Sequence, residues 1–501
     1  MSPKGYFTAA LAAVNTTSNA LAQDTLEYAT CLWTRDVCNV SARSKKKANA
    51  APKKCRRGPP RRVYLRLDAD VPPANLQVSL ALLVAGDTDQ AVRAVSALAA
   101  LYKRADHAEC MERMIGAPSV SPAAAAKCII PFLQLKTYFV APSAAAKGEG
   151  YSNFTAAPVR FEASSGNRTD PWAHMQLDAL GLFLIAYGSL GARRLLTPDA
   201  ALIGRFLRYL WAIQYWTRAD LGHWEEWPAL VRSSSLGCVV AGVRAAAALL
   251  PAAESEELQA DALAARGREV LDQRLGDDSG GAWEAEGRRE DAALLTLLLP
   301  PVAAALDLTP RQHAALASTA LRLRRSHGVL RYVGDSYYGA DYQARLGRWK
   351  AANGCGDPGA YPLPDERNSW AVPACEAEWT IFEPLLLLHF LWAHRRERSE
   401  ESGAAVRRCL MRILAAIEEG PPGSGPSGGS DVRLHVHESY AVVGGVRRPN
   451  DVQDLLWAVA YVRMALAALE QALREGEPGS FIRVKSRGTF DVPGSGASSP
   501  G

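Results

Sequence analysis

Long apolar helical segments run through this chain from Leu76 onward and restrict what it can fold into. Six runs are apolar almost all round, near residues 76–102, 176–188, 235–250, 290–299, 379–393 and 451–472. Between them lie stretches that place Arg, Glu and Gln on one face, near residues 199–218, 255–274, 309–325 and 403–418. A helix that is apolar all round is buried, whereas an amphipathic helix faces solvent on one side. The alternation predicts helical hairpins in an inner and an outer layer; a helical bundle or a solenoid would satisfy the same pattern.

The segments around these helices indicate how the chain is divided. Its 501 residues, 48% of them hydrophobic, suggest about three domains by length alone. No break in the helical segments supports a division, so we expect one domain over residues 1–475. Residues 41–62 are expected to form a basic, disordered insertion, residues 420–430 a flexible Gly/Pro/Ser loop, and residues 476–501 a flexible tail.

Charge and cysteine usage exclude several classes of protein. The formal net charge of +5 comes from residues 41–62, which hold ten Lys or Arg and no acidic residue. The rest of the chain has 47 basic and 52 acidic residues. This balance argues against a nucleic-acid-binding protein. The sequence contains no run of ~18 apolar residues that would predict a membrane span, and we see no signal peptide. Nine Cys without zinc-type spacing indicate free thiols in a reducing, cytoplasmic compartment.

A loop motif, Leu-Gly-His-Trp-Glu-Glu at residues 221–226, carries the first sign of chemistry. Glu225 and Glu226 are adjacent carboxylates that follow Trp224. A neighbouring like charge and an apolar ring both disfavour ionisation, so that one carboxyl group can keep its proton near neutral pH. A general acid at a glycosidic oxygen needs such a proton. Two solvated loop residues are the alternative interpretation of this motif alone.

Five further motifs accompany this one in order along the chain. The six are Trp33-Thr34-Arg35-Asp36, Trp172–Gly181, His223–Glu226, Arg289–Leu295, Glu376–Phe382, and His437–Tyr440 with Pro449-Asn450 and Leu455–Ala458. Over roughly residues 25–475 they resemble glycoside hydrolase family 15, the glucoamylase family. The second and fifth are closer to its non-hydrolytic relatives, the α and β regulatory subunits of phosphorylase kinase. Six motifs in the same order are far more specific than any one of them.

The resemblance implies an all-α (α/α)6 toroid and an inverting hydrolase that releases glucose from the non-reducing ends of α-glucans or α-glucosides. It implies Glu225 as the general acid and Glu438 as the general base. The substrate-binding residues that it implies are Trp33, Arg35, Asp36, Trp172, Gln176, Asp178, Trp224, Glu226 and Trp379, with Tyr332 and Asp335 as weaker candidates. No cofactor or metal is implied, and the expected partner is a carbohydrate substrate without nucleic acid or membrane. The sequence does not indicate an oligomeric state.

Two positions depart from the family pattern. The basic insertion begins about five residues after Asp36, and Ser439 follows Glu438 where glucoamylases usually have Gln. Because the second and fifth motifs are closer to the kinase subunits, a non-hydrolytic glucan-binding or regulatory protein is the alternative. His435 and His437 lack a third clear ligand, so we expect them at the surface and not in a metal site.

Overall fold

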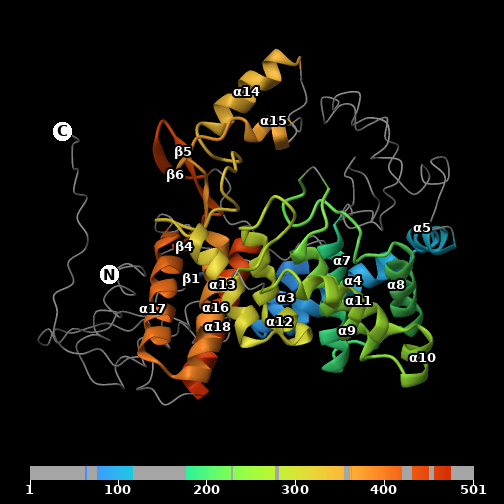
Figure 1. The fold of residues 1–501 in the computed structure, drawn as a ribbon. Helices are drawn as coiled ribbons and strands as arrows, with labels where there is room; N and C mark the ends of the chain where they lie inside the picture. Colours follow the sequence, from blue (N-terminus) through green and yellow to red (C-terminus); the bar gives the residue numbers. More distant parts are fainter. Residues whose placement is uncertain are drawn as a thin grey trace, which may run out of the picture.

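A computed structural model describes residues 63–64, 76–116, 176–226, 229–276, 281–354, 362, 364–419, 432–450 and 456–475 (Figure 1). The described chain is mostly helical, as the sequence predicts. The expected basic insertion at residues 41–62, the loop at residues 420–430 and the tail at residues 476–501 lie outside the described residues.

The helices and strands have the following bounds. The α-helices are α3 (Leu76–Val84), α4 (Thr88–Lys103), α5 (Ala105–Gly116), α7 (Leu177–Ala192), α8 (Ala200–Ala212), α9 (Ser233–Ala247), α10 (Ala252–Glu257), α11 (Ala260–Asp272), α12 (Pro300–Leu306), α13 (Pro310–Leu323), α14 (Tyr342–Ala352), α15 (Pro364–Asn368), α16 (Glu383–Glu397), α17 (Glu400–Ala415) and α18 (Leu456–Glu475). Short 3-10 helices are η3 (Ala292–Leu298) and η4 (Thr380–Phe382). The strands are β1 (Val63–Tyr64), β2 (Glu378–Trp379), β3 (Ile417–Glu419), β4 (Val432–Val436), β5 (Ser439–Val443) and β6 (Val446–Pro449).

Three of the expected apolar helices differ in form from a single continuous α-helix. The run 76–102 divides into α3 and α4 at Gly86, whose φ of +86° favours glycine. The run 290–299 forms the 3-10 helix η3, and Pro300 starts the new helix α12 because proline suits a first helical turn. The run 379–393 begins as strand β2, and α16 starts only at Glu383.

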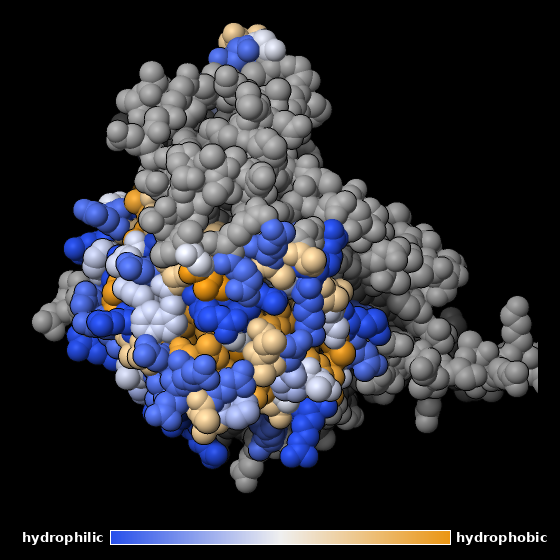
Figure 2. All heavy atoms as spheres, turned by 90° about the vertical axis from the view of Figure 1, so that its right-hand side faces the viewer, coloured by the Kyte–Doolittle hydropathy of each residue, from blue (hydrophilic) through white to orange (hydrophobic). Residues whose placement is uncertain are grey.

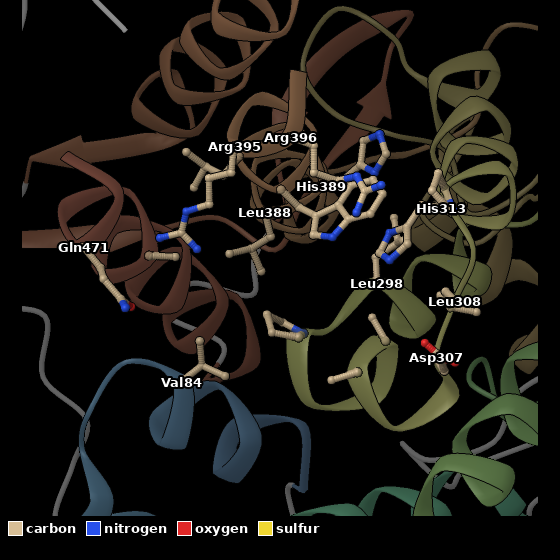
Figure 3. A pocket seen from close by; sticks show the side chains of 17 residues that line it. Val84, Leu298, Asp307, Leu308, His313, Leu388, His389, Arg395, Arg396 and Gln471 are labelled. Atoms are coloured by element: carbon tan, nitrogen blue, oxygen red, sulfur yellow. The ribbon is translucent and has the colours of Figure 1, made fainter. Parts of the chain in front are cut away.

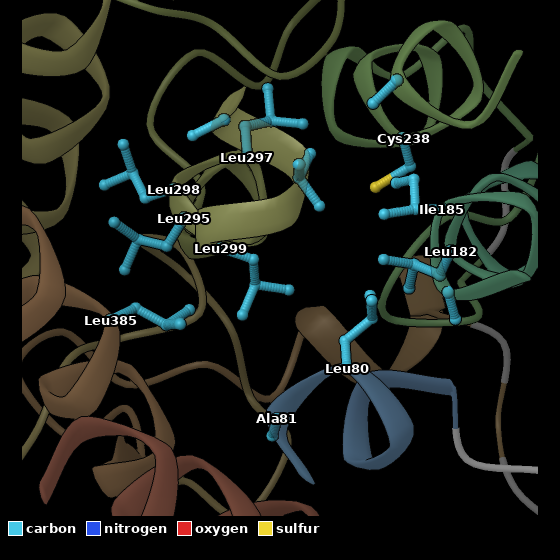
Figure 4. Close-up of a cluster of buried hydrophobic side chains, with 14 of the residues drawn as sticks. Leu80, Ala81, Leu182, Ile185, Cys238, Leu295, Leu297, Leu298, Leu299 and Leu385 are labelled. Carbon is cyan, nitrogen blue, oxygen red and sulfur yellow. The ribbon is translucent and has the colours of Figure 1, made fainter. Parts of the chain in front are cut away.

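The apolar helices contact one another in a closed circuit. α3 packs against α7, α7 against α9, α9 against η3, η3 against α16, α16 against α18, and α18 again against α3. Figure 4 shows side chains from several of these elements meeting in the core, among them Leu80, Ile185, Cys238, Leu295 and Leu385. All five are fully buried, so the inner layer that the sequence predicts is present.

The amphipathic helices cover the outside of this circuit. α11 packs on α9, α13 on η3 and α16, and α17 on α16. The run 76–102 was expected to be buried all round, but its second part, α4, has an exposed face that includes Arg93 and packs on α3 from outside, so this part of the expectation is wrong. Figure 2 shows the face on the right-hand side of Figure 1, where hydrophilic residues surround small, separate hydrophobic spots. This division between inner and outer helices follows the hydrophobic pattern of the sequence.

Glycines allow α7 and α9 to approach closely. A Cβ atom on Gly181 would lie 2.3 Å from the carbonyl carbon of Cys238, and one on Gly242 would lie 2.6 Å from the carbonyl oxygen of Gly181. These contacts are with backbone atoms, which cannot rotate away. The two inner helices therefore depend on glycine at their crossing.

The described residues also form two small three-stranded sheets, in the orders β1-β4-β3 and β2-β5-β6. In the second sheet β5 pairs antiparallel with β2, which places Ser439 opposite Trp379. The backbone N–H of Thr380 also donates to the carbonyl oxygen of Glu438 at 3.1 Å. This pairing joins two predicted site segments that are about 60 residues apart in sequence.

None of the helices in the described ranges is long and apolar enough to cross a lipid bilayer.

Replacing Gly181 with Ala should lower the free energy of unfolding by about 2 kcal/mol or more, because the added methyl group meets the backbone of α9. Gly347→Ala is the matched control, since Gly347 lies on α14 and no atom of the described residues is within 4 Å of its added Cβ. This control should be neutral or stabilising by about 0.5–1 kcal/mol. Urea unfolding followed by circular dichroism measures both changes. Equal effects of the two substitutions would contradict the close packing of α7 on α9.

Candidate active site

Buried carboxylates occupy the N-terminal ends of three inner elements. Asp220 accepts from the N–H of Leu177 at the start of α7, at 2.9 Å. Glu284 accepts from the N–H of Ser234 at the start of α9, at 2.9 Å, and Asp291 accepts from the N–H of Ala293 in η3, at 2.8 Å. The first N–H groups of a helix have no partner within the helix and carry partial positive charge, so carboxylates satisfy them well.

Burial changes the acidity of these groups. Loss of solvation, with the nearby charge of Asp178, raises the pKa of Asp220 to about 7. Burial, with the charge of Glu284, raises the pKa of Asp291 to about 6. Burial also raises the pKa of Glu284. This end of the helical circuit therefore concentrates proton-holding groups.

The Trp-Glu-Glu motif lies in a tight loop between these carboxylates. Asp220 and Leu230 form an antiparallel bridge that closes the loop. Gly222 and Glu225 have φ values of +59° and +58°. A positive φ is unfavourable for a residue with a side chain, so the conformation of Glu225 is maintained by its surroundings.

Glu225 and Gln176 meet although they come from different motifs. The side-chain amide of Gln176 donates to Oε1 of Glu225 at 3.0 Å. Gln176 immediately precedes α7 and is buried, which gives the amide a fixed position. Two of the predicted site residues are thus in direct contact.

Glu226 is buried and has several donors around its two oxygens. Arg331 and Arg367 donate to Oε1, Tyr332 donates to Oε2 at 2.9 Å, and Arg288 donates to Oε2 at 3.3 Å. Its side chain is 2% exposed. We call this group the Glu226 cluster. Tyr332, a weaker candidate in the sequence, is therefore part of the site region.

Two further carboxylates balance the arginines of the Glu226 cluster. Asp335 pairs with Arg331 at 3.1 Å and with Arg367 at 3.8 Å. Asp291 pairs with Arg288 at 3.5 Å. Buried arginines need such compensation, because an unpaired charge inside a protein is strongly unfavourable.

Trp224 and Trp379 lie next to each other, with ring centroids 6.4 Å apart. Trp224 donates from Nε1 to Asp291 at 2.8 Å, and the guanidinium of Arg331 lies 4.6 Å from its ring. Tyr337 stacks on Trp379 at 6.0 Å and an angle of 8°. Trp224 is partly buried, whereas Trp379 is 3% exposed and supports the region from below the surface.

Glu438 belongs to the same region. Asn450 donates from its side-chain amide to Oε2 of Glu438 at 3.1 Å. Burial raises the pKa of Glu438, while the hydrogen bond from Asn450 and the charge of Arg331 lower it. The pKa of Tyr337 is raised mainly by burial and by the neighbouring Tyr338 and Tyr342. The charge of Glu438 is a smaller cause that acts in the same direction. Arg331 therefore acts on Glu438 as well as on Glu226.

The remaining predicted residues divide into two groups. Asp178 is buried in the first turn of α7, and one of its oxygens lies 3.7 Å from Nδ1 of His223. Trp33, Arg35, Asp36 and Trp172 lie outside the described residues.

One expectation about histidines is wrong. His437 is not at the surface: it is 1% exposed, and its Nε2 lies 3.0 Å from a carboxylate oxygen of Glu418. His437 lies between β4 and β5, where the chain passes from one small sheet to the other. Within the described ranges, no group of three or more His, Cys, Asp or Glu residues could hold a metal ion.

Sequence reasoning missed several residues that build this site. Arg331 immediately precedes Tyr332, and Asn450 belongs to the sixth motif, so a signal for both was present although neither was given a role. Arg288 and Arg367 carry no local pattern, because their partners lie 62 and 141 residues away. Asp220 and Glu284 are likewise recognisable only once the helix N-termini are in place.

The fold is similar to that of a solved glycosidase. The wild-type form of this glycosidase has a TM-score of 0.50 and 18% identity, covering 79% of this chain and 86% of that chain. A variant of a glycosidase in complex with glucose has a TM-score of 0.48 at 17% identity over the same shares. A glucoamylase from Saccharomycopsis fibuligera has a TM-score of 0.45 at 12% identity, covering 79% of this chain and 84% of that chain. The first likeness establishes a mostly helical, glycosidase-like fold and carries no activity to this chain.

No protein-family model matches the sequence, and no curated protein matches it.

Proposed function

We propose that this protein is an inverting, exo-acting glycoside hydrolase that releases glucose from the non-reducing ends of α-glucans or α-glucosides. The observation that carries the proposal is the position of Arg331. It binds Glu226, the neighbour of Glu225, and its charge stabilises the ionised form of Glu438. Segments 213 residues apart thus contribute carboxylates to one charged region. An inverting glycosidase needs two carboxyl groups around one sugar, ~6.5–9.5 Å apart.

In this proposal Glu225 is the general acid and Glu438 the general base. Gln176 orients Glu225 through its hydrogen bond, and the closed loop limits where that carboxyl group can point. Glu438 must be ionised to take a proton from water. Burial disfavours that form, and Asn450 with Arg331 offsets the effect by lowering the pKa of Glu438.

Substrate contacts follow from the residues around this pair. Trp224 offers a partly exposed ring beside Glu225, and Gln176 and Asp178 lie at the start of α7. Glu226 contributes through the loop that it anchors, since both of its oxygens already accept from protein groups. Trp33, Arg35, Asp36 and Trp172 are proposed to hold the terminal glucose, and Trp379 to support the wall.

We further propose that the circuit of helix contacts is an (α/α)6 toroid within a single domain over residues 1–475. The return of the contacts from α18 to α3 supports closure. The site would then lie at the end where the inner helices begin. Two carboxylates and a water molecule suffice for this reaction, so the proposal includes no cofactor.

The proposal is tested by incubating the purified protein with maltotriose and, separately, trehalose, and by following the released glucose with anomer-resolved NMR. We expect β-glucose to appear first. Glu225→Gln and Glu438→Gln should each lower kcat by about 10²–10⁴-fold, because proton transfer in the transition state is lost. Glu397→Gln, at the exposed C-terminal end of α16, is the control and should leave the rate unchanged.

Release of α-glucose first, or no glucose from either substrate, would contradict the proposal. Binding of maltotriose without turnover, unchanged in both variants, would instead favour the alternative of a non-hydrolytic glucan-binding or regulatory protein. Two observations favour this alternative. Both oxygens of Glu226 already accept from protein groups, and the sequence of residues 174–178 is closer to the phosphorylase kinase subunits than to glucoamylases.

The pH dependence of activity gives an independent prediction. A base with a raised pKa is ionised only at higher pH, so activity should fall on the acid side at a higher pH than an ordinary Glu would give. Asn450→Ala removes a donor that lowers this pKa, and the acid limb of kcat should move to still higher pH. Asn353→Ala, at the exposed end of α14, should leave the limb in place. An acid limb that stays, or moves to lower pH, in Asn450→Ala would contradict the assignment of Glu438 as base.

A further inference from the structure

A cavity lies away from the carboxylate region, at the opposite end of α16. Its volume is about 440 Å³, within the range of small-molecule sites. It is lined by the second half of α16, the end of α3, the end of η3, α12, the start of α13 and the last part of α18 (Figure 3). The lining residue Arg396 stands 13 residues beyond the first residue of α16, which is about 20 Å along a helix. None of the lining residues belongs to the Glu226 cluster.

Three nearly parallel rings form one wall of this cavity. His313 stacks on Trp392 with centroids 3.9 Å apart and an angle of 15°. His389 lies 6.1 Å from His313 and 6.0 Å from Trp392, also nearly parallel to them. Leucine and proline side chains supply much of the remaining wall. The cavity therefore suits a flat apolar body.

Both histidines keep a polar atom without a partner. His313 is 7% exposed and His389 is 8% exposed, and within the described part of the chain the Nδ1 atom of each has no hydrogen-bond partner. Burial lowers the pKa of each to about 4, so both rings are neutral at pH 7 and each can donate one N–H. A buried polar atom without a partner is unfavourable, and an acceptor on a ligand would satisfy it.

The charge around the cavity sets the charge of the ligand. Arg396 lies 5.1 Å from the Trp392 ring, close enough that its charge contributes to lowering the pKa of His313. Arg395 already pairs with Glu475 at 2.8 Å. Asp307 lines the cavity from the other side, near Leu308 in Figure 3. Among the described residues that line the cavity, Arg396 is thus the cation that remains for a ligand, and the nearby carboxylate of Asp307 opposes a second negative charge on that ligand.

We propose that this cavity binds a small organic monoanion with a flat apolar body, such as an aromatic carboxylate. The body lies against the leucine walls beside the three rings. The carboxylate accepts from Arg396 and from an imidazole N–H. This site is separate from the proposed catalytic carboxylates and does not rest on the proposed function.

Isothermal titration calorimetry on the full chain tests this site with 2-naphthoate as the probe. We expect one molecule of 2-naphthoate to bind to each chain. The neutral analogue 2-naphthylmethanol should bind at least about tenfold more weakly, because a hydrogen bond to a charged group is lost. The dianion naphthalene-2,6-dicarboxylate should also bind more weakly than 2-naphthoate. Absence of binding by 2-naphthoate, or equal binding of the neutral or doubly charged probe, would overturn the proposal.

Substitutions of lining residues test whether 2-naphthoate binds in this cavity. Arg396→Gln should weaken 2-naphthoate binding about tenfold. His389→Phe, which keeps a ring but removes the nitrogens, should also weaken it. Arg348→Gln, on the exposed face of α14 at the other end of the molecule, makes the same charge change and should have no effect. Thermal unfolding confirms that each variant is folded. An unchanged affinity in folded Arg396→Gln, or an equal loss in Arg348→Gln, would place the probe elsewhere and overturn the assignment.

Discussion

The burial of Glu226 is the constraint on which the site depends. A carboxylate that is 2% exposed needs charge compensation, and three arginines from separate segments supply it. Arg288 precedes η3, Arg331 follows α13, and Arg367 lies in α15. Each must be brought to the loop that carries Glu226, so one buried charge joins four parts of the chain. The neighbouring residue, Glu225, takes its position from that junction, and Arg331 extends the same constraint to Glu438.

The helical circuit explains why this junction forms where it does. The starts of α7, α9 and η3 each present unpaired N–H groups, and Asp220, Glu284 and Asp291 accept from them. Carboxylates that would be unfavourable inside the protein are stabilised there by helix N-termini as well as by arginines. The close crossing of α7 and α9 at their glycines brings two of these N-termini together. The core packing of the inner helices and the electrostatics of the site are therefore parts of one arrangement.

Much of this could be predicted from the sequence, and the remainder has physical reasons for escaping it. Apolar and amphipathic segments predicted the inner and outer helices, because burial follows periodicity. The ordered motifs predicted Gln176, Trp224 and Trp379 as site residues, and the structure places them in or beside the loop that carries Glu225 and Glu226. The break at Gly86 was missed, since it stands within an apolar run, and the 3-10 form of η3 was missed, since an apolar run does not distinguish a 3-10 helix from an α-helix. Arg288 and Arg367 could not be found, because ion-pair partners are chosen by tertiary packing. The cavity beside His389 also draws its walls from six elements that only the fold assembles.

A double-mutant cycle between Glu226 and Arg331 tests most directly whether the Glu226 cluster holds the site together. The free energy of unfolding would be measured in urea for wild type, Glu226→Gln, Arg331→Gln and the double variant. Each single substitution should destabilise the fold by about 3 kcal/mol, because it leaves a buried charge without its partner. The double variant should recover about 2 kcal/mol relative to the sum of the single effects, since the two residues are in contact. Additive effects, or single effects below about 0.5 kcal/mol as for exposed residues, would contradict this role for Glu226.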